Sequence, residues 1–371
     1  MSIGQNLILD GTKLVWHMDR VRAWLNGERI APLYIECAIT TNCSYNCTFC
    51  YGQLQRKGTG GLSRDVVMKF LDDAAEIGVK AIALIGDGEN TCNPCLKEAI
   101  IHGKSKGLDM ALGTNGYLLK DEDLEEILPC LTYLRFNISA GTPEGYSTIH
   151  GVSEKCYHKV QGTIRKAVET KKKLNLPVTI GLQMVLLPEF GSEIMPLAEL
   201  GRDAGVDYLV IKHCSDDEEG SLGVDYKGYA QLEDLLKRAQ ALSTPDYLVK
   251  PKWSKITSEG KRTYSHCYGP AFVLQVSGAG IVAPCGMFFN DKYKKYHIGS
   301  LMEQGFKEMW ESERYWEVLD MIKGDCFDAR KDCGTLCHQH KVNEMLDMIM
   351  NNPDEDLPEP ESPKPDHINF I

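Results

Sequence analysis

The chain has 371 residues, is 43% hydrophobic and 25% charged, and carries a formal net charge of −11. This composition is ordinary for a globular protein with a sizeable core. The only sustained basic run is Lys171–Lys173, which argues against nucleic acid as the main partner because phosphate binding needs clustered cations. No segment has the length of a membrane span or the layout of a secretory signal, so we expect a cytoplasmic protein without a membrane partner.

Short apolar runs alternate with longer amphipathic segments in the first two thirds of the chain, which predicts strands alternating with helices. Six β-then-α units of this kind favour an α/β fold, a partial (β/α)6 TIM-like barrel with its ligands at the carboxyl ends of the strands. The predicted strands cover 33–39, 80–86, 108–114, 131–139, 178–187 and 207–213, and the predicted helices lie at 63–78, about 94–106, from 121, about 155–173 and in 193–205.

The pattern changes after residue 213, where an acidic loop precedes a helix, a hairpin over 267–287 and a second helix. This change predicts a small appended domain. The tail is rich in proline and acidic residues, so we expect it to be flexible or extended, although its apolar end, HINFI, could dock on the body. The expected divisions are an N-terminal extension 1–32, a barrel 33–225, a second domain 226–345 and a tail 346–371.

Three of the fourteen cysteines, Cys43, Cys47 and Cys50, form a C-x3-C-x2-C run in the loop after the first predicted strand. In a reducing compartment, clustered cysteines indicate metal ligation or catalysis rather than disulfides. A four-iron cubane needs one donor per iron, so three thiolates leave one iron open, and an open metal position is typical of chemistry rather than scaffolding. A structural zinc site completed by a distant ligand is the alternative.

With Phe49 before the last cysteine, the run resembles that of the radical S-adenosylmethionine (SAM) enzymes. The resemblance implies a [4Fe–4S] cluster on the three cysteines, whose fourth iron binds the amino and carboxylate groups of SAM. It also implies an electron donor such as flavodoxin or ferredoxin. One electron cleaves SAM to a 5′-deoxyadenosyl radical, which abstracts a hydrogen atom from the substrate.

The same resemblance implies SAM contacts at later strand ends. Gly86-Asp87-Gly88-Glu89 stands where the family has Gly-Gly-Glu, which holds the SAM ammonium, and it departs from that pattern at Asp87. Glycine permits close backbone approach and Glu89 can pair with a cation, so Glu89 is preferred over Asp87, with an ordinary glycine-rich turn as the alternative. Polar residues that alternate with apolar ones share one face of a strand. The candidate cofactor-binding residues are Phe49, Gly86, Gly88, Glu89, Asn115, Asn137, Ser139 and Gln183.

A second cysteine set resembles the SPASM and twitch extensions of this superfamily. Cys267, Gly280 and Cys285 match their hairpin, and the resemblance implies an auxiliary [4Fe–4S] cluster held entirely by protein, with a zinc site as the alternative. Five cysteines are available for four positions, and Cys326 and Cys333 compete for one of them. The candidate ligands are Cys267, Cys285, Cys326, Cys333 and Cys337.

Cys214 follows the sixth predicted strand, where a barrel presents residues to its substrate. It could donate a hydrogen atom to a product radical, and Lys212, His213 and Asp216 could bind a polar substrate. An ordinary loop cysteine beside a solvated acidic run is the alternative.

The sequence therefore predicts a radical SAM oxidoreductase or epimerase with a small polar substrate, such as a sugar, aminosugar or nucleotide sugar. The segment before the first strand is short for the leader-binding domain of peptide-modifying members. Two alternatives remain: an enzyme that modifies a peptide or protein by thioether formation or residue epimerisation, and a zinc-stabilised binding protein without enzymatic activity.

Overall fold

The computed structural model of the chain describes residues 7–9, 11–55, 60–335 and 337–371. Its strands are β1 (Tyr34–Cys37), β2 (Ala81–Leu84), β3 (Asp109–Thr114), β4 (Leu131–Asn137), β5 (Thr179–Leu186), β6 (Tyr208–His213), β7 (Leu248–Pro251), β8 (Val273–Val276), β9 (Ile281–Ala283) and β10 (Gly299–Ser300). They form one sheet in the order β10-β9-β8-β1-β2-β3-β4-β5-β6-β7. The strands from β8 to β7 are parallel to their neighbours, while β9 is antiparallel to both β8 and β10.

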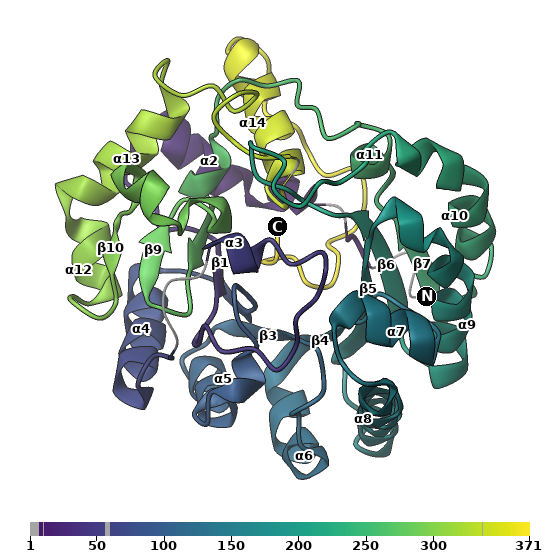
Figure 1. The fold of residues 1–371 in the computed structure, drawn as a ribbon. Helices are drawn as coiled ribbons and strands as arrows, with labels where there is room; N and C mark the ends of the chain where they lie inside the picture. The colour runs from purple at the N-terminus through teal and green to yellow at the C-terminus, as the bar shows by residue number, and fades with distance from the viewer. Residues whose placement is uncertain (1–6, 10, 56–59, 336) are drawn as a thin grey trace.

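The helices lie mainly on the outside of this curled sheet, as Figure 1 shows in a view into the ring of strands. They are α2 (Met18–Leu25), α3 (Gly52–Gln55), α4 (Arg64–Ile77), α5 (Leu96–Ser105), α6 (Leu124–Ile127), α7 (Pro143–His150), α8 (Glu154–Lys173), α9 (Ile194–Ala204), α10 (Glu233–Gln240), α11 (Trp253–Ile256), α12 (Phe306–Glu311), α13 (Glu313–Lys323) and α14 (His340–Asn351). In the described part of the chain, no helix combines the length and apolarity needed to cross a membrane.

Helix α4 illustrates how local sequence sets these elements. The Ser63 hydroxyl accepts a hydrogen bond from the Val66 backbone nitrogen, which caps the first turn. Gly78 ends the helix in the left-handed conformation, with φ of 99°, where a side chain would be strained. The helix predicted over 63–78 is confirmed, and so is the hairpin within 267–287, which β8 and β9 form.

The partial barrel with an appended C-terminal segment is confirmed, and the sheet is longer than the six predicted strands. Strand β7 pairs with β6 and strand β8 pairs with β1. Both come from the range 226–345, so the second predicted domain adds strands to each side of the barrel sheet. β7 contains four residues and ends at Pro251, and so short a run gives little period-2 signal.

Two apolar layers cover the two faces of the sheet. The outer layer packs the strands against the surrounding helices and includes Phe70, Ile164 and Leu236. The inner layer fills the amino end of the barrel and includes Tyr34, Tyr133 and residues from α2 and α14. The barrel is therefore closed at its amino end, which leaves the carboxyl ends of the strands for a site.

The last residues of the chain form part of this inner layer, and Figure 1 shows the C-terminus in the middle of the ring. Phe370 and Ile371 are buried, and the Phe370 ring packs edge-on against Tyr34 and Tyr133 with centroids 5.4 and 5.0 Å away. The Asn369 amide donates to Asp109 at 2.7 Å. The apolar end of the tail does dock on the body, and helix α14 extends past residue 346 to Asn351.

Candidate active site

A cavity of about 260 Å³ lies at the carboxyl ends of the strands. Its wall draws on the loop after β1, on the segment after β2, on Asn115 after β3 and on side chains near the ends of β4, β5, β6 and β8. Pockets in this position are where barrels of parallel strands hold their ligands. The residues predicted to hold SAM and its cluster that line it are Cys43, Cys47, Phe49, Cys50, Gly86, Gly88, Glu89, Asn115, Asn137 and Gln183.

The three cysteines of the first motif share this wall, on a loop that is tied to the end of α7. The Asn46 backbone nitrogen donates to the His150 carbonyl at 3.1 Å, and the Thr48 nitrogen donates to the Ile149 carbonyl at 2.9 Å. Three half-buried thiols that line one cavity fit a [4Fe–4S] cluster that the protein would hold at three of its four irons.

His150 was missed by sequence reasoning, and it contacts the sulfur of Cys47. Its Nε2 accepts a hydrogen bond of 3.0 Å from the Ser139 backbone nitrogen, and its Nδ1 lies 3.1 Å from Cys47 Sγ. Burial lowers the pKa of His150 to about 3, so the ring is neutral and carries its proton on Nδ1. That N–H donates to the sulfur, a contact of the kind that tunes a metal ligand.

Ser139 lies behind the wall rather than in it. Its side chain is buried, and the hydroxyl accepts a hydrogen bond of 3.1 Å from the Val185 backbone nitrogen, which joins the chain after β4 to β5. Asn137 and Gln183 do line the cavity, and the Gln183 amide donates to Asn137 Oδ1 at 3.1 Å. The alternation in the fourth strand therefore placed Asn137 correctly on the interior face.

The carboxylate of Glu89 lines the cavity but is already well hydrogen bonded. It accepts from the Thr91 nitrogen and hydroxyl at 3.2 and 2.8 Å, from the Thr114 hydroxyl at 2.7 Å and from the Asn115 nitrogen at 2.7 Å. Burial raises the pKa of Glu89 in spite of these bonds. Gly88 packs so closely on the loop after β1 that an added Cβ would overlap the Thr40 carbonyl oxygen, so this glycine is needed for packing whatever it contributes to a ligand.

Four of the five C-terminal cysteines surround a second, small and mostly apolar cavity: Cys267, Cys285, Cys333 and Cys337. Cys326 is exposed and is not part of it. Two side chains donate to these sulfurs, Arg262 Nη2 to Cys333 at 3.3 Å and Asn343 Nδ2 to Cys267 at 3.6 Å. The structure therefore brings Cys333, and not Cys326, together with the other three.

The donor set fits an iron–sulfur cluster, because four thiols surround one cavity. A cubane takes one thiolate per iron and so spreads its ligands around a larger core, whereas zinc draws its ligands to about 2.3 Å from one point.

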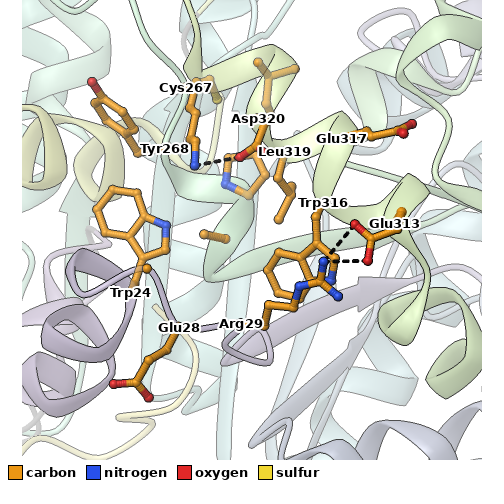
Figure 2. Close-up of a pocket in the computed structure, with 15 residues that line it drawn as sticks. Trp24, Glu28, Arg29, Cys267, Tyr268, Glu313, Trp316, Glu317, Leu319 and Asp320 are labelled. Carbon is orange, nitrogen blue, oxygen red and sulfur yellow. Dashed lines mark hydrogen bonds and ion pairs between the residues drawn. The ribbon is translucent and has the colours of Figure 1, made fainter.

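A third cavity, of about 320 Å³, opens between α2, α13 and the Cys267 segment. Figure 2 shows Trp24 and Trp316 in its wall, with Arg29 bound to Glu313 at 2.7 Å. Cys267 lines this hollow as well as the four-cysteine cavity.

Cys285 and Cys337 also line two cavities, the four-cysteine cavity and the cavity at the strand ends. The two sites therefore meet at a shared wall. Cys214, in contrast, lines neither cavity. Its side chain is fully buried, its thiol lies 3.5 Å from the Phe49 carbonyl, and burial raises its pKa to about 12.

The remaining wall of the strand-end cavity is basic. Lys212, which the sequence analysis considered as a substrate contact, lines it, while His213 and Asp216 do not. Further basic residues there were missed by sequence reasoning: Arg135, Lys252, Lys255 and His338. Arg135 lies two residues before Asn137 on the same strand face, so the alternation of β4 could have revealed it.

The comparisons with known proteins agree with this geometry. A family model described as "Radical SAM superfamily" matches residues 37–201, and the SPASM model, described as "Iron-sulfur cluster-binding domain", matches residues 267–339. The "Tungsten-containing aldehyde ferredoxin oxidoreductase cofactor-modifying protein" of Pyrococcus furiosus is 24% identical over 318 residues, covering 81% of this chain and 86% of that protein. The "AdoMet-dependent heme synthase" of Methanosarcina barkeri is 26% identical over 320 residues, covering 80% and 88%.

Among solved structures, Streptococcus suis SuiB bound to SAM matches with a TM-score of 0.64 at 16% identity, covering 83% of this chain and 71% of SuiB. This likeness concerns the fold. The curled parallel sheet with thiols at its carboxyl end, joined to a second cysteine site, defines an iron–sulfur enzyme of the partial-barrel class. The chain belongs to the radical SAM superfamily and carries a SPASM domain. Its cofactors are SAM, a SAM-binding [4Fe–4S] cluster and auxiliary iron–sulfur ligation, as predicted.

Proposed function

We propose that the chain binds a small polar substrate in the strand-end cavity, removes a hydrogen atom from it and oxidises it. Cys43, Cys47 and Cys50 would hold the SAM-binding cluster, and Cys267, Cys285, Cys333 and Cys337 would hold the auxiliary one. When bound, the first cluster and SAM supply the 5′-deoxyadenosyl radical. The observation that carries the proposal is the shared wall, because Cys285 and Cys337 line the substrate cavity as well as the four-cysteine cavity.

The shared wall would allow the substrate to be oxidised, with an acceptor for each hydrogen atom, electron and proton that leaves it. A substrate alcohol that becomes a carbonyl gives up its carbon-bound hydrogen atom, one electron and its hydroxyl proton. The SAM-derived radical and the auxiliary cluster would accept the hydrogen atom and the electron when they are bound, and a base in the wall would take the proton. Glu36 is a carboxylate in the cavity wall that could take this proton, held by a 3.1 Å bond from the Tyr34 hydroxyl. His338 Nδ1 lies 3.8 Å from Glu36 Oε2.

Oxidation is favoured over epimerisation by the position of Cys214. Epimerisation needs a hydrogen-atom donor that reaches the substrate radical, and the predicted donor is fully buried outside the cavity. Cys214 is retained as the donor only in the epimerase alternative, and a Cys214→Ala variant separates the two outcomes. Product formed at the wild-type rate removes the thiol from the mechanism, whereas hydrogen abstraction without product restores it.

A polar substrate is favoured by the polar and charged side chains in the cavity wall, among them Asn137, Gln183 and Lys212. By their names, one relative modifies a cofactor and the other is a heme synthase. The sequence predicts a sugar, aminosugar or nucleotide sugar as the substrate, and these names add cofactors to the candidate substrates. The peptide-modifying alternative has one observation in its favour: SuiB, which shares the fold, was solved with its precursor peptide SuiA.

The test is anaerobic incubation of the reconstituted enzyme with SAM, a reductant and candidate substrates, with 5′-deoxyadenosine measured. We expect a small polar substrate to increase its formation and a deuterated substrate to pass deuterium into it. Deuterium transfer from a peptide instead would support the alternative. A wild-type enzyme that holds iron but releases no deoxyadenosine under any condition contradicts the proposal.

A further inference from the structure

The basic wall of the cavity contains three cationic side chains that form no salt bridge with a carboxylate of the described residues. Arg135 comes from β4, Lys212 from β6 and Lys255 from α11, and all three line the strand-end cavity. Lys255 is 8% exposed. Within the described residues, none of the three side chains forms a hydrogen bond or a salt bridge, and the Arg135 Nε is buried without a partner.

These cations repel one another as well as lacking partners. Burial, followed by the charge of Arg135, lowers the pKa of Lys212 to about 8. A buried charge without compensation is expensive for a folded protein, so side chains arranged in this way destabilise the free enzyme.

The carboxylates of the cavity are engaged elsewhere. Glu36 is bound by Tyr34 and Gln275 and faces His338. Asp87 accepts from the Gly278 nitrogen, and Glu89 has the four bonds described above. Glu36 is within electrostatic range of Arg135 and Lys212, but one carboxylate does not balance three cations. A negative charge on a ligand would complete the wall.

We propose that Arg135, Lys212 and Lys255 form a subsite for an anionic group of the substrate, a carboxylate or a phosphate. This inference rests on the proposed function, since it names the chemical class of molecule bound at the same site. Arginine and lysine donors binding such groups form charge-assisted hydrogen bonds, which are stronger than neutral ones. The anion would fix the substrate at one end and leave its other end toward the cysteine loop.

The test is calorimetric titration of the reconstituted, SAM-loaded enzyme with inorganic phosphate and, separately, with acetate. We expect at least one anion to bind saturably, and its dissociation constant to rise at least tenfold in Lys212→Met and Lys255→Met. The matched control is Lys237→Met, because Lys237 is exposed on α10 and its loss should leave binding unchanged. Preference for phosphate indicates a phosphate ester, and preference for acetate a carboxylic acid. Binding of neither anion, or equal binding by all variants, overturns the inference.

Three further measurements separate competing roles. Lys255→Arg keeps the charge and should keep anion binding, which guards against a folding defect in the methionine variant. Lys255 also interacts with Cys337, so loss of auxiliary iron in Lys255→Met would assign this cation to the cluster and overturn its place in the subsite. If Lys212→Met and Lys255→Met bind SAM more weakly in equilibrium dialysis, the basic wall would be assigned to the SAM carboxylate. If the wild type binds phosphate or acetate but never forms deoxyadenosine, the proposed function fails while the anion subsite stands.

Discussion

Asp87 Oδ1 accepts a hydrogen bond of 2.8 Å from the backbone nitrogen of Gly278. The bond joins the segment after β2, which lines the strand-end cavity, to the turn between β8 and β9 in the SPASM region. The same turn touches the start of the cysteine loop, since a Cβ on Gly278 would overlap the Thr40 backbone. The residue that departs from the family pattern therefore holds the cavity and the C-terminal hairpin together.

Replacing Asp87 tests this bond. Asp87→Ala should lower the free energy of unfolding by about 1–3 kcal/mol, the usual loss when a buried donor is left without a charged acceptor. Asp87→Asn keeps an acceptor oxygen and should lose less, as measured by thermal or chemical denaturation. Equal stability losses in both variants would show that the bond depends on the negative charge of Asp87 and not only on its acceptor oxygen.

The choice between Cys333 and Cys326 predicts a difference in iron content. Cys333→Ser should lose the auxiliary cluster, about four irons per chain, because Cys333 lines the four-cysteine cavity. Cys326→Ser should keep its iron, because Cys326 is exposed outside that cavity. Iron and sulfide analysis with absorption spectra checks both variants, and the opposite pattern would restore Cys326 as the fourth ligand.

The contact between His150 and Cys47 predicts a shift in reduction potential. A hydrogen bond to a cluster-ligating sulfur stabilises the reduced cluster and raises its potential, so His150→Phe should lower the potential of the SAM-binding cluster. Redox titration followed by electron paramagnetic resonance checks the shift. His158→Phe is the control, since His158 is exposed on α8. An unchanged potential in His150→Phe would mean that this N–H does not reach the loaded cluster.

The packing of Phe370 predicts a large effect on stability. Phe370→Ala should lower the free energy of unfolding by about 3–5 kcal/mol, because it removes a buried ring that packs on Tyr34 and Tyr133. Chemical denaturation measures this loss, and Glu359→Ala, at an exposed position of the tail, should have no effect. A loss below about 1 kcal/mol would show that the tail end contributes little to the closed end of the barrel.

The depressed pKa of Lys212 predicts how stability changes at alkaline pH. In the folded protein this pKa is about 8, against 10.5 for an ordinary lysine. Between these values the unfolded chain binds more protons than the folded one, so the free energy of unfolding of the ligand-free enzyme should rise with pH. Arg135, Glu36 and Cys214 also influence this group. Lys212→Met should therefore show a flatter rise, and identical slopes in the two proteins would contradict the assignment.

The barrel strands and both cysteine sites could be predicted because their signals are local. Apolar runs, glycine-rich turns and the spacing of Cys43, Cys47 and Cys50 can be read within a few residues. Cys326 and Cys333 could not be separated in this way, since both have plausible spacing and only packing brings Cys333 beside Cys285.

The basic wall could not be predicted for a related reason. Lys255 lies on a four-residue helix that carries no motif, and only the pairing of β7 with β6 brings it to the cavity. The burial of Cys214 was also missed. Lys212 lines the cavity, but Cys214, two residues later, lies behind the wall with its thiol against the Phe49 carbonyl.

Cys285 and Cys337 lie in the wall between the four-cysteine cavity and the strand-end cavity. A change at the auxiliary site would therefore affect both cavities. Loss of the auxiliary cluster would also change the shape of the strand-end cavity. Variants that lose this cluster should therefore bind the substrate more weakly even where the SAM-binding cluster is retained.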